Sequence, residues 1–222
     1  EKTLPLRGYK ILISAGGTKE RIDPVRYITN DSSGKMGHSI AEAAYQYGAE
    51  VTLVTASTLE SSKAIHRIQV DSAKEMFEAI DECFEDLDIL IMSAAVSDYG
   101  VADAATSKMK KADLKEPLTI ELQENPDILK TMGEKKENQF LVGFAAETNQ
   151  LEDYALKKLA EKNLDLIVAN EVGKEGTGFD SDDNQVVIFT KEHQRLDIPK
   201  TSKTEIARRI LDKVIEELDH HS

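Results

Sequence analysis

Residues 10–17 read KILISAGG, a short apolar run that ends in two adjacent glycines. An apolar run of this length that stops at a turn signal is typical of a strand buried on both faces of a parallel sheet. The next periodic segment, at 36–47, repeats apolar residues at helical spacing, and Gly48 follows as a helix-ending residue. The stretch therefore predicts a strand at 10–15 and a helix at 36–47, the first β-α unit of an α/β domain.

The same alternation of apolar strands and amphipathic helices continues along the chain. It predicts strands at 50–55, 66–70, 87–92, 117–122, 140–144 and 164–169, with helices around 73–83, after Asp127, at 150–162 and after the cap candidates Thr201 and Ser202. A strand at 185–190 is expected to pair with one around 195–198. The expected fold is one α/β domain over 1–222, a Rossmann-like, doubly wound, mainly parallel sheet with helices on both faces and a small antiparallel extension.

Periodicity stops between 97 and 116, where several lysines stand among Ala, Ser and Asp. A long irregular loop at the binding end of a sheet is usually functional or mobile, so we predict a mobile flap near 100–116. Its cations could close over phosphates, or they could form an ordinary solvated face. The lysines are Lys108, Lys110, Lys111 and Lys115.

Composition excludes several functions. The 41 acidic and 28 basic residues give a formal net charge of −13, which disfavours nucleic-acid partners. No apolar stretch approaches the roughly 20 residues of a membrane helix, and the first residues lack a signal-peptide pattern, so a cytoplasmic protein without membrane contact is expected. The one cysteine, Cys83, continues an apolar helix face and is predicted to be a packed thiol. The five histidines show no metal-binding spacing.

In a doubly wound sheet the ligand lies beyond the carboxyl ends of the strands. Gly16 and Gly17 follow the first strand, and Ser32, Ser33 and Gly34 stand just before a helix start, where unpaired amides favour an anion. Ordinary helix capping by either serine is the alternative. Neither the dinucleotide fingerprint Gly-x-Gly-x-x-Gly nor the Gly-x-x-x-x-Gly-Lys-Ser/Thr phosphate loop is present, which disfavours standard hydride transfer and P-loop hydrolysis.

Three further positions each allow two interpretations. Asp98 could accept hydrogen bonds from ribose hydroxyls or be a solvated turn acid. Phe144, at a strand end, could flank a nucleotide base or belong to the core. Lys158 and Lys162 lie four residues apart on a helix, so they could be aimed together at an anion or could extend past apolar neighbours into water.

Six motifs, taken together and in order, resemble the bacterial phosphopantothenate–cysteine ligase family, also called phosphopantothenoylcysteine synthetase. The resemblance covers roughly residues 9–216. The motifs are SAGGT at 14–18, ITNDSSGKMG at 28–37, AAVSDY at 94–99, KMKK at 108–111, NPD at 125–127 and GFAAET at 143–148.

The resemblance implies an early step of coenzyme A biosynthesis. CTP, with Mg²⁺, activates the carboxylate of 4'-phosphopantothenate as an acyl-cytidylate, and the amine of L-cysteine then displaces CMP. It also implies a homodimer. In many bacteria this domain is fused to a phosphopantothenoylcysteine decarboxylase. The six motifs here belong to the synthetase alone, so a stand-alone form with a possible separate decarboxylase partner is expected.

The resemblance also assigns residues. Asn30 is expected at the reacting acyl group and Lys108 at the nucleotide phosphates, and these two are the predicted catalytic residues; no metal ligands are assigned. With Gly16, Gly17, Ser32 and Ser33 from the residue patterns, the predicted nucleotide contacts are Met92, Ser93, Ala94, Asp98, Lys108, Asn125, Pro126, Asp127, Ile128, Phe144, Lys158 and Lys162.

Two other functions remain open on the same fold. An NAD(P)-dependent reductase lacks support because the glycine fingerprint is missing. A non-catalytic nucleotide sensor would use the same pocket but would need neither Asn30 nor a flap that reaches a second substrate.

Overall fold

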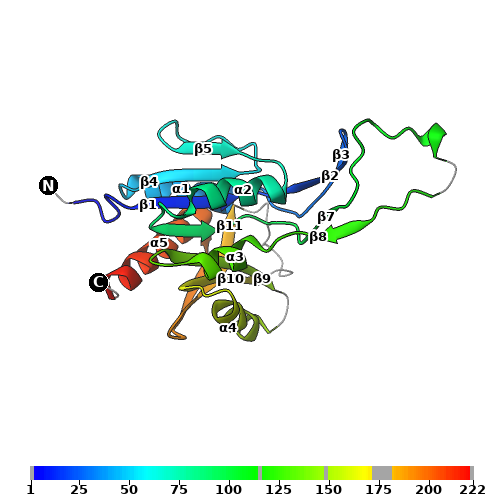
Figure 1. The fold of residues 1–222 in the computed structure, drawn as a ribbon. Helices are drawn as coiled ribbons and strands as arrows, with labels where there is room; N and C mark the ends of the chain where they lie inside the picture. Colours follow the sequence, from blue (N-terminus) through cyan, green and yellow to red (C-terminus); the bar gives the residue numbers. More distant parts are fainter. Residues whose placement is uncertain (1–2, 115–116, 148–149, 172–181, 221–222) are drawn as a thin grey trace.

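The computed structural model describes residues 3–114, 117–147, 150–171 and 182–220. Its centre is an eight-stranded sheet in the order β12-β11-β10-β9-β6-β1-β4-β5 (Figure 1). Strands β5 to β10 of this order pair in parallel, and β11 and β12 add antiparallel pairs at one edge, as predicted. The strands are β1 (Lys10–Ala15), β4 (Glu50–Thr55), β5 (His66–Gln69), β6 (Ile89–Met92), β9 (Phe140–Glu147), β10 (Leu166–Glu171), β11 (Asp183–Thr190) and β12 (Arg195–Ser202).

Helices cover both faces of this sheet, so the Rossmann-like α/β prediction is confirmed. On one face, α1 (Lys35–Gln46) and α5 (Lys203–His220) pack over one apolar cluster. On the other, α2 (Ala73–Phe84), α3 (Ile128–Lys135) and α4 (Leu151–Glu161) pack over a second cluster. Ser202 caps α5 by accepting the Glu205 N–H at 3.2 Å, as one of the two predicted caps.

Strand β1 shows why the apolar run at 10–15 forms the centre of the sheet. Its neighbours are β4 and β6, both parallel to it. Because side chains alternate along a strand, Ile11 and Ile13 enter the core beneath α1 and α5, whereas Leu12 enters the core beneath α2. All three side chains are fully buried, which explains why the run is continuously apolar.

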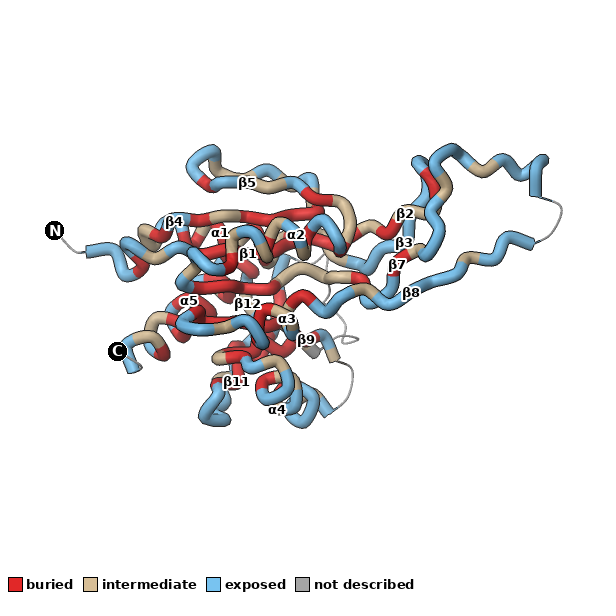
Figure 2. The backbone as a smooth tube through the Cα atoms, in the orientation of Figure 1, coloured by how far each residue is buried: buried red, intermediate tan, exposed pale blue. Residues whose placement is uncertain are grey.

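Two small antiparallel ribbons extend away from the sheet (Figures 1 and 2). One pairs β2 (Lys19–Asp23) with β3 (Arg26–Thr29), and the other pairs β7 (Tyr99–Val101) with β8 (Leu122–Glu124). A 3-10 helix, Lys111–Asp113, lies at the far end. We call residues 19–29 and 99–124 the arm; most of its described residues are exposed (Figure 2).

The arm corrects the sequence prediction at two places. The strand predicted at 117–122 is wrong: 117–121 forms no strand, and β8 begins only at Leu122. The alternation of Leu118, Ile120 and Leu122 looked like a strand, but in the described part of the chain no strand pairs with 117–121 and most of these residues are exposed. The β2–β3 hairpin was not predicted at all. The flap near 100–116 corresponds to the outer arm; its mobility stays a prediction, and Lys115 lies outside the described residues.

Two smaller expectations can also be compared with the structure. Cys83 packs beside the second apolar cluster, and burial raises the pKa of its thiol, as a packed cysteine requires. Among the described helices, none is both long enough and apolar enough to cross a membrane.

Candidate functional site

The loops after β1 and β6 meet where the chain leaves the sheet in opposite directions. After β1 the chain continues to α1 on one face, and after β6 it continues through the β7–β8 ribbon to α3 on the other face, so a crevice opens beyond these strand ends. An isolated bridge joins Gly17 to Ala95, and the Ala95 N–H donates to the Gly16 carbonyl at 2.9 Å. These contacts hold the two loops together at the base of the crevice.

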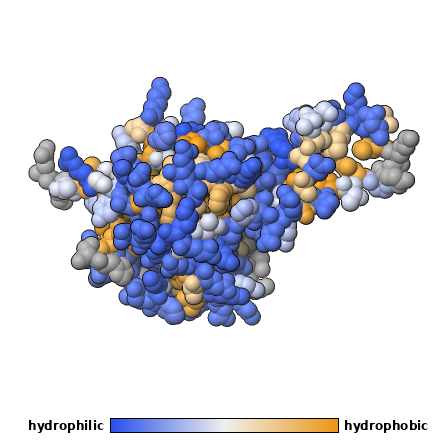
Figure 3. All heavy atoms as spheres, viewed as in Figure 1, coloured by the Kyte–Doolittle hydropathy of each residue, from blue (hydrophilic) through white to orange (hydrophobic). Residues whose placement is uncertain are grey.

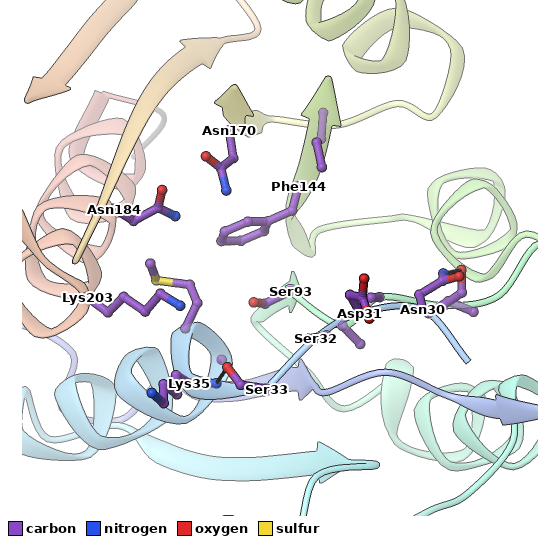
Figure 4. Close-up of a pocket in the computed structure, with 18 of the residues that line it drawn as sticks. Asn30, Asp31, Ser32, Ser33, Lys35, Ser93, Phe144, Asn170, Asn184 and Lys203 are labelled. Carbon is purple, nitrogen blue, oxygen red and sulfur yellow. Dashed lines mark hydrogen bonds between the residues drawn. The ribbon is translucent and has the colours of Figure 1, made fainter. Parts of the chain in front are cut away.

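The larger pocket in this crevice has a volume of about 650 Å³. We call it the α1 pocket, because the first turn of α1 forms one wall and the ends of β6, β9 and β10 face it (Figure 4). Its described lining is Thr29, Asn30, Asp31, Ser32, Ser33, Gly34, Lys35, Met36, Gly37, Ser93, Ala94, Ala95, Val96, Phe144, Ala145, Ala146, Lys158, Asn170, Asn184, Val186 and Lys203.

The start of α1 shows what its glycine and serine do. Gly34 is the N-cap residue with φ of 80°, a left-handed conformation that favours glycine. The Ser33 hydroxyl accepts the Lys35 N–H at 3.3 Å, but the N-cap residue is Gly34 and no side chain caps the helix, so the predicted capping by a serine is wrong (Figure 4). Both Ser32 and Ser33 line the pocket. The helix start, with its partial positive charge, therefore faces the pocket.

The opposite wall contains polar residues that the sequence reasoning missed. Lys203 is only 6% exposed and Asn184 5% exposed, and both line the α1 pocket with Asn170 (Figure 4). The Oδ1 atom of Asn170 is buried and has no hydrogen-bond partner among the described residues. Asn170 directly follows the predicted strand 164–169, so the rule of searching after each strand could have found it. Lys203 and Asn184 carried no such signal.

Asn30 stands at the pocket edge, directly after β3. Its side-chain amide donates to the Val96 carbonyl at 3.3 Å, which ties the end of the hairpin to the loop after β6. An amide nitrogen carries two N–H donors, so the second can meet a ligand oxygen. A side chain on Gly17 would come within 2.5 Å of the Asn30 carbonyl, so glycine at 17 allows Asn30 to lie this close to the first loop.

The smaller pocket, of about 340 Å³, adjoins the first one. We call it the α3 pocket, because the start of α3 forms part of it. Both pockets share Ala94, Val96 and Phe144 in their walls. Its described lining is Met92, Ala94, Val96, Ser97, Asp98, Tyr99, Glu124, Asn125, Pro126, Asp127, Ile128, Leu129, Phe144 and Lys162.

Hydrogen bonds fix the loops of the α3 pocket. Asn125 donates from its side chain to the Ser97 carbonyl at 2.9 Å, and its backbone N–H donates to the Asp98 carbonyl at 2.7 Å. Asp98 itself is exposed toward the pocket. The Ser97 hydroxyl is buried without a described partner, and sequence reasoning did not single it out. The pocket wall thus contains Ser97 and Asp98 on a loop that Asn125 holds in place.

The two helix-borne lysines reach different pockets. Lys158 lines the α1 pocket and lies 3.5 Å from the Glu147 carboxylate. Lys162 lines the α3 pocket and lies 3.0 Å from Asp127, which also caps α3 by accepting the Lys130 N–H. Burial opposes ionisation of Asp127, but that N–H and the Lys162 ammonium together hold its pKa below the ordinary value. Both lysines are ion-paired at pocket edges, so they do not simply extend into water.

The structure brings most of the predicted site residues to these two pockets. Phe144 both packs against the core and lines the two pockets; its contact with a nucleotide base stays a prediction. Gly16, Gly17 and Lys108 are not among the described lining residues of either pocket. A side chain on Gly16 would come within 2.7 Å of the Ser57 backbone nitrogen, so this glycine permits close packing of two loops. Lys108 is exposed on the arm.

Comparison with known proteins gives consistent matches. A family model described as the DNA/pantothenate metabolism flavoprotein C-terminal domain matches residues 6–218. The coenzyme A biosynthesis bifunctional protein CoaBC of Vibrio vulnificus (strain YJ016) is 47% identical over 212 residues, which is 95% of this chain and 53% of that protein. The CoaBC of Bacillus subtilis (strain 168) is 47% identical over 216 residues, 96% of this chain and 53% of that protein.

A solved structure gives the same answer. The crystal structure of the C-terminal domain of a coenzyme A biosynthesis bifunctional protein CoaBC superposes with a TM-score of 0.83 at 41% identity, over 98% of this chain and 99% of that one. The chain thus spans about half the length of the curated relatives that it matches. By sequence and by fold, this chain belongs to the family of DNA/pantothenate metabolism flavoprotein C-terminal domains.

Proposed function

We propose that this domain is a ligase that joins 4'-phosphopantothenate to L-cysteine in coenzyme A biosynthesis, with CTP as the activating nucleotide. Relatives that bear the name of coenzyme A biosynthesis proteins match nearly the whole chain, which supports the pathway. The six motifs described above support the reaction. The choice of CTP over ATP rests on the motif resemblance.

One structural observation carries the proposal: the two pockets adjoin and share a wall at Ala94, Val96 and Phe144. A nucleotide bound across this shared wall can therefore present its α-phosphate to a carboxylate held beside it. Asn30 stands at the edge of the α1 pocket, beside this shared wall, and its amide is held by the Val96 carbonyl. Holding both reactants at a fixed separation removes much of the entropic barrier to a two-substrate reaction.

In the first half-reaction, a carboxylate oxygen of phosphopantothenate attacks the α-phosphorus of CTP, and pyrophosphate leaves. The two anions repel each other, so the site must supply positive charge and N–H donors. The start of α1 and Lys158 supply these in the α1 pocket, and Lys162 supplies a cation in the α3 pocket. Asp98 lines the α3 pocket, and we expect its carboxylate to accept hydrogen bonds from the ribose hydroxyls.

In the second half-reaction, the cysteine amine attacks the acyl carbon, loses a proton, and CMP leaves. The attack places negative charge on the acyl oxygen. An N–H of Asn30 donates to this oxygen, where a fixed donor is most effective because charge develops there. The neutral amide of Asn30 does not itself attack the activated ester.

Magnesium belongs to the proposal as part of the nucleotide substrate. Among the described residues, no group of three or more His, Cys, Asp or Glu side chains is placed to hold a metal ion. We therefore propose that Mg²⁺ enters bound to the phosphates of CTP, where it offsets their charge.

A homodimer is a second part of the proposal, supported by the surface of the arm. Apolar side chains gather on the arm, in contrast with the mostly hydrophilic face of the body in the same view (Figure 3). Large apolar residues exposed on a protein surface commonly mark a protein–protein contact. Those on the arm are Val25, Tyr27, Ile28, Tyr99, Leu114, Leu118 and Leu122. Light scattering at micromolar concentration tests this; a fully active monomer would refute it.

The function is tested by measuring pyrophosphate release with phosphopantothenate and MgCTP, with and without cysteine. The proposal predicts release that requires phosphopantothenate, formation of CMP and phosphopantothenoylcysteine once cysteine is added, and slower turnover when ATP replaces CTP at the same concentration. Binding of CTP without pyrophosphate release would instead identify a nucleotide sensor. Turnover with ATP equal to that with CTP would refute the nucleotide assignment.

A further inference from the structure

A buried carboxylate lies at the turn of the β2–β3 hairpin. Asp23 is only 1% exposed, although it lies in the exposed arm. Its Oδ1 atom accepts the backbone N–H groups of Val25 and Arg26, both at 2.9 Å, which closes the hairpin turn. Its Oδ2 atom accepts the Arg26 guanidinium, whose Nε lies at 3.0 Å. These donors offset the cost of burying the charge.

The same carboxylate also holds a segment of the arm 86 residues away in sequence. The Met109 N–H donates to Asp23 Oδ2 at 3.2 Å, and the Met109 carbonyl accepts from Arg26 Nη2 at 2.7 Å. Both backbone groups of Met109 are thus held by one ion pair. Four residues earlier, the Ala105 N–H donates to the Ile22 carbonyl at 2.9 Å. The loop from 105 to 109 is therefore fixed at each end against the hairpin turn.

Lys108 lies inside this fixed loop, next to Met109. The hairpin that holds the loop ends at Thr29, and Asn30 follows at once. The two residues predicted to act on the reacting groups are therefore connected through one buried carboxylate. Closing the hairpin turn requires only the Oδ1 contacts; the Oδ2 contact with Met109 has no part in the turn.

We call residues 105–109 the lysine loop. We propose that Asp23 is a positioning residue that holds the lysine loop, and with it Lys108, in a fixed relation to the hairpin that leads into Asn30. This inference rests on the proposed function, because it assumes that Lys108 acts on the phosphates during the reaction. A lysine side chain is long and flexible, so a loop fixed at its backbone loses less entropy when the ammonium engages a ligand. Asp23 itself touches no substrate.

The ion pair between Asp23 and Arg26 persists at neutral pH. The Arg26 guanidinium, with the N–H groups of Val25, Met109 and Arg26, holds the pKa of the Asp23 carboxyl well below its ordinary value, against the opposing effect of burial. The carboxylate is therefore ionised throughout the neutral range, so its bonds to the loop persist at these pH values.

The test is Asp23→Asn, which keeps the side chain's size and the Oδ1 acceptor but removes the charge that pairs with Arg26. We expect kcat for pyrophosphate release to fall by about tenfold or more, whereas CTP affinity measured by calorimetry changes less than about twofold. The matched control is Asp71→Asn. Asp71 pairs with Arg21 on the same hairpin at 2.8 Å, but it has no described bond to the lysine loop, so kcat should stay near that of the wild type.

A second comparison shows whether Asp23 acts through Lys108. In a Lys108→Gln background, adding Asp23→Asn should lower kcat by less than about twofold more, because the residue it positions is already gone. Limited trypsin digestion gives a readout without activity: cleavage after the lysines at 108–111 should become several-fold faster in Asp23→Asn. If Asp23→Asn fails to fold, Ala105→Pro takes its place, because this change removes the other anchoring N–H without altering the hairpin. Trypsin cleavage after these lysines should then be several-fold faster in Ala105→Pro than in the wild type.

Wild-type kcat and wild-type trypsin cleavage in Asp23→Asn would overturn the proposal, as would a full additional loss in the Lys108→Gln background. If the wild-type protein releases no pyrophosphate at all, the proposed function fails, but the trypsin comparison still decides whether Asp23 holds the loop.

Discussion

The body of the molecule and its arm are stabilised in different ways. The body buries continuous apolar strands between two layers of helices: every residue of β6, and every residue of β1 after Lys10, is buried. The arm has exposed strands: every residue of β3 and β8 is exposed. Described polar bonds such as those of Asp23 join its segments. Hydrophobic burial therefore shapes the body, and specific hydrogen bonds shape the arm.

The largest expected difference between the two regions is in stability. Phe84, in the core beneath α2, is 1% exposed, and Phe84→Ala should lower the free energy of unfolding by about 3–5 kcal/mol through lost burial and a residual cavity. Leu122 on the arm is 45% exposed, and Leu122→Ala should change it by less than about 0.5 kcal/mol. Urea denaturation measures both. A loss for Leu122→Ala as large as that for Phe84→Ala would show that the arm has a core of its own.

This difference also explains how much of the fold could be predicted. Where side chains meet a core, burial imposes a period of two or 3.6 residues, so the strand at 10–15 and the helix at 36–47 were predicted nearly to the residue. On the arm no core imposes a period. The hairpin at 19–29 was missed because its two strands are short and β3 is exposed along its whole length, so no apolar alternation marks them.

The second prediction concerns activity, for which we expect a substitution on the arm to have a large effect. Lys108→Gln removes a cation from the arm but keeps side-chain length, so acyl-cytidylate formation should fall by about 10²-fold, near 3 kcal/mol of transition-state stabilisation. Unfolding free energy should hardly change, because Lys108 is exposed. Single-turnover assays of pyrophosphate release measure the effect; an unaltered rate would mean that this lysine is only solvated.

The third prediction concerns lysines fixed to the body. Lys158→Ala and Lys162→Ala should each weaken CTP binding by about tenfold, near 1.4 kcal/mol, with a smaller change in the saturated rate, because both line the pockets. Lys157→Ala is the matched control, since Lys157 pairs with Glu161 on the exposed side of the same helix. Unchanged CTP affinity by calorimetry in both variants would remove these lysines from the site.

The candidate site was predicted to a different degree from the fold. The strand-end rule singled out Phe144, the four-residue spacing on a predicted helix singled out Lys158 and Lys162, and the motif resemblance alone singled out Asn30. The far wall of the α1 pocket was missed. Asn184 and Lys203 come from β11 and the start of α5, and only the antiparallel edge pairing brings them to the pocket. Their position depends on how distant strands pair, which no local pattern reveals.

The smallest expected effect lies between two helices of the body. The Tyr47 hydroxyl donates to Asp212 at 2.8 Å, and burial together with this carboxylate raises the pKa of Tyr47 to about 12. The protonated phenol is favoured in the folded state, so its contribution is complete below the unfolded pKa of about 10 and is lost as pH rises toward about 12. Tyr47→Phe should cost about 1 kcal/mol at pH 8.

The pH dependence of the unfolding free energy tests whether the Tyr47–Asp212 hydrogen bond makes this contribution. Between about pH 10 and 12, the difference in unfolding free energy between wild type and Tyr47→Phe should shrink, because only the wild type has this group to titrate. Denaturation of both proteins at several pH values measures it. A difference that stays constant across this range would show that the hydrogen bond does not control the titration.

The central claim is that Asn30, at the junction of arm and body, stabilises the charge that forms when cysteine attacks the activated acyl group. Asn30→Asp puts a negative charge in place of the donor, so the second half-reaction should slow by about 10²–10³-fold, about 2.7–4 kcal/mol, while activation by CTP continues. Rapid-quench analysis with phosphopantothenate, MgCTP and cysteine should therefore show acyl-cytidylate accumulating in Asn30→Asp. Normal cysteine-dependent turnover, or an equal loss of both steps with no trapped intermediate, would contradict the account.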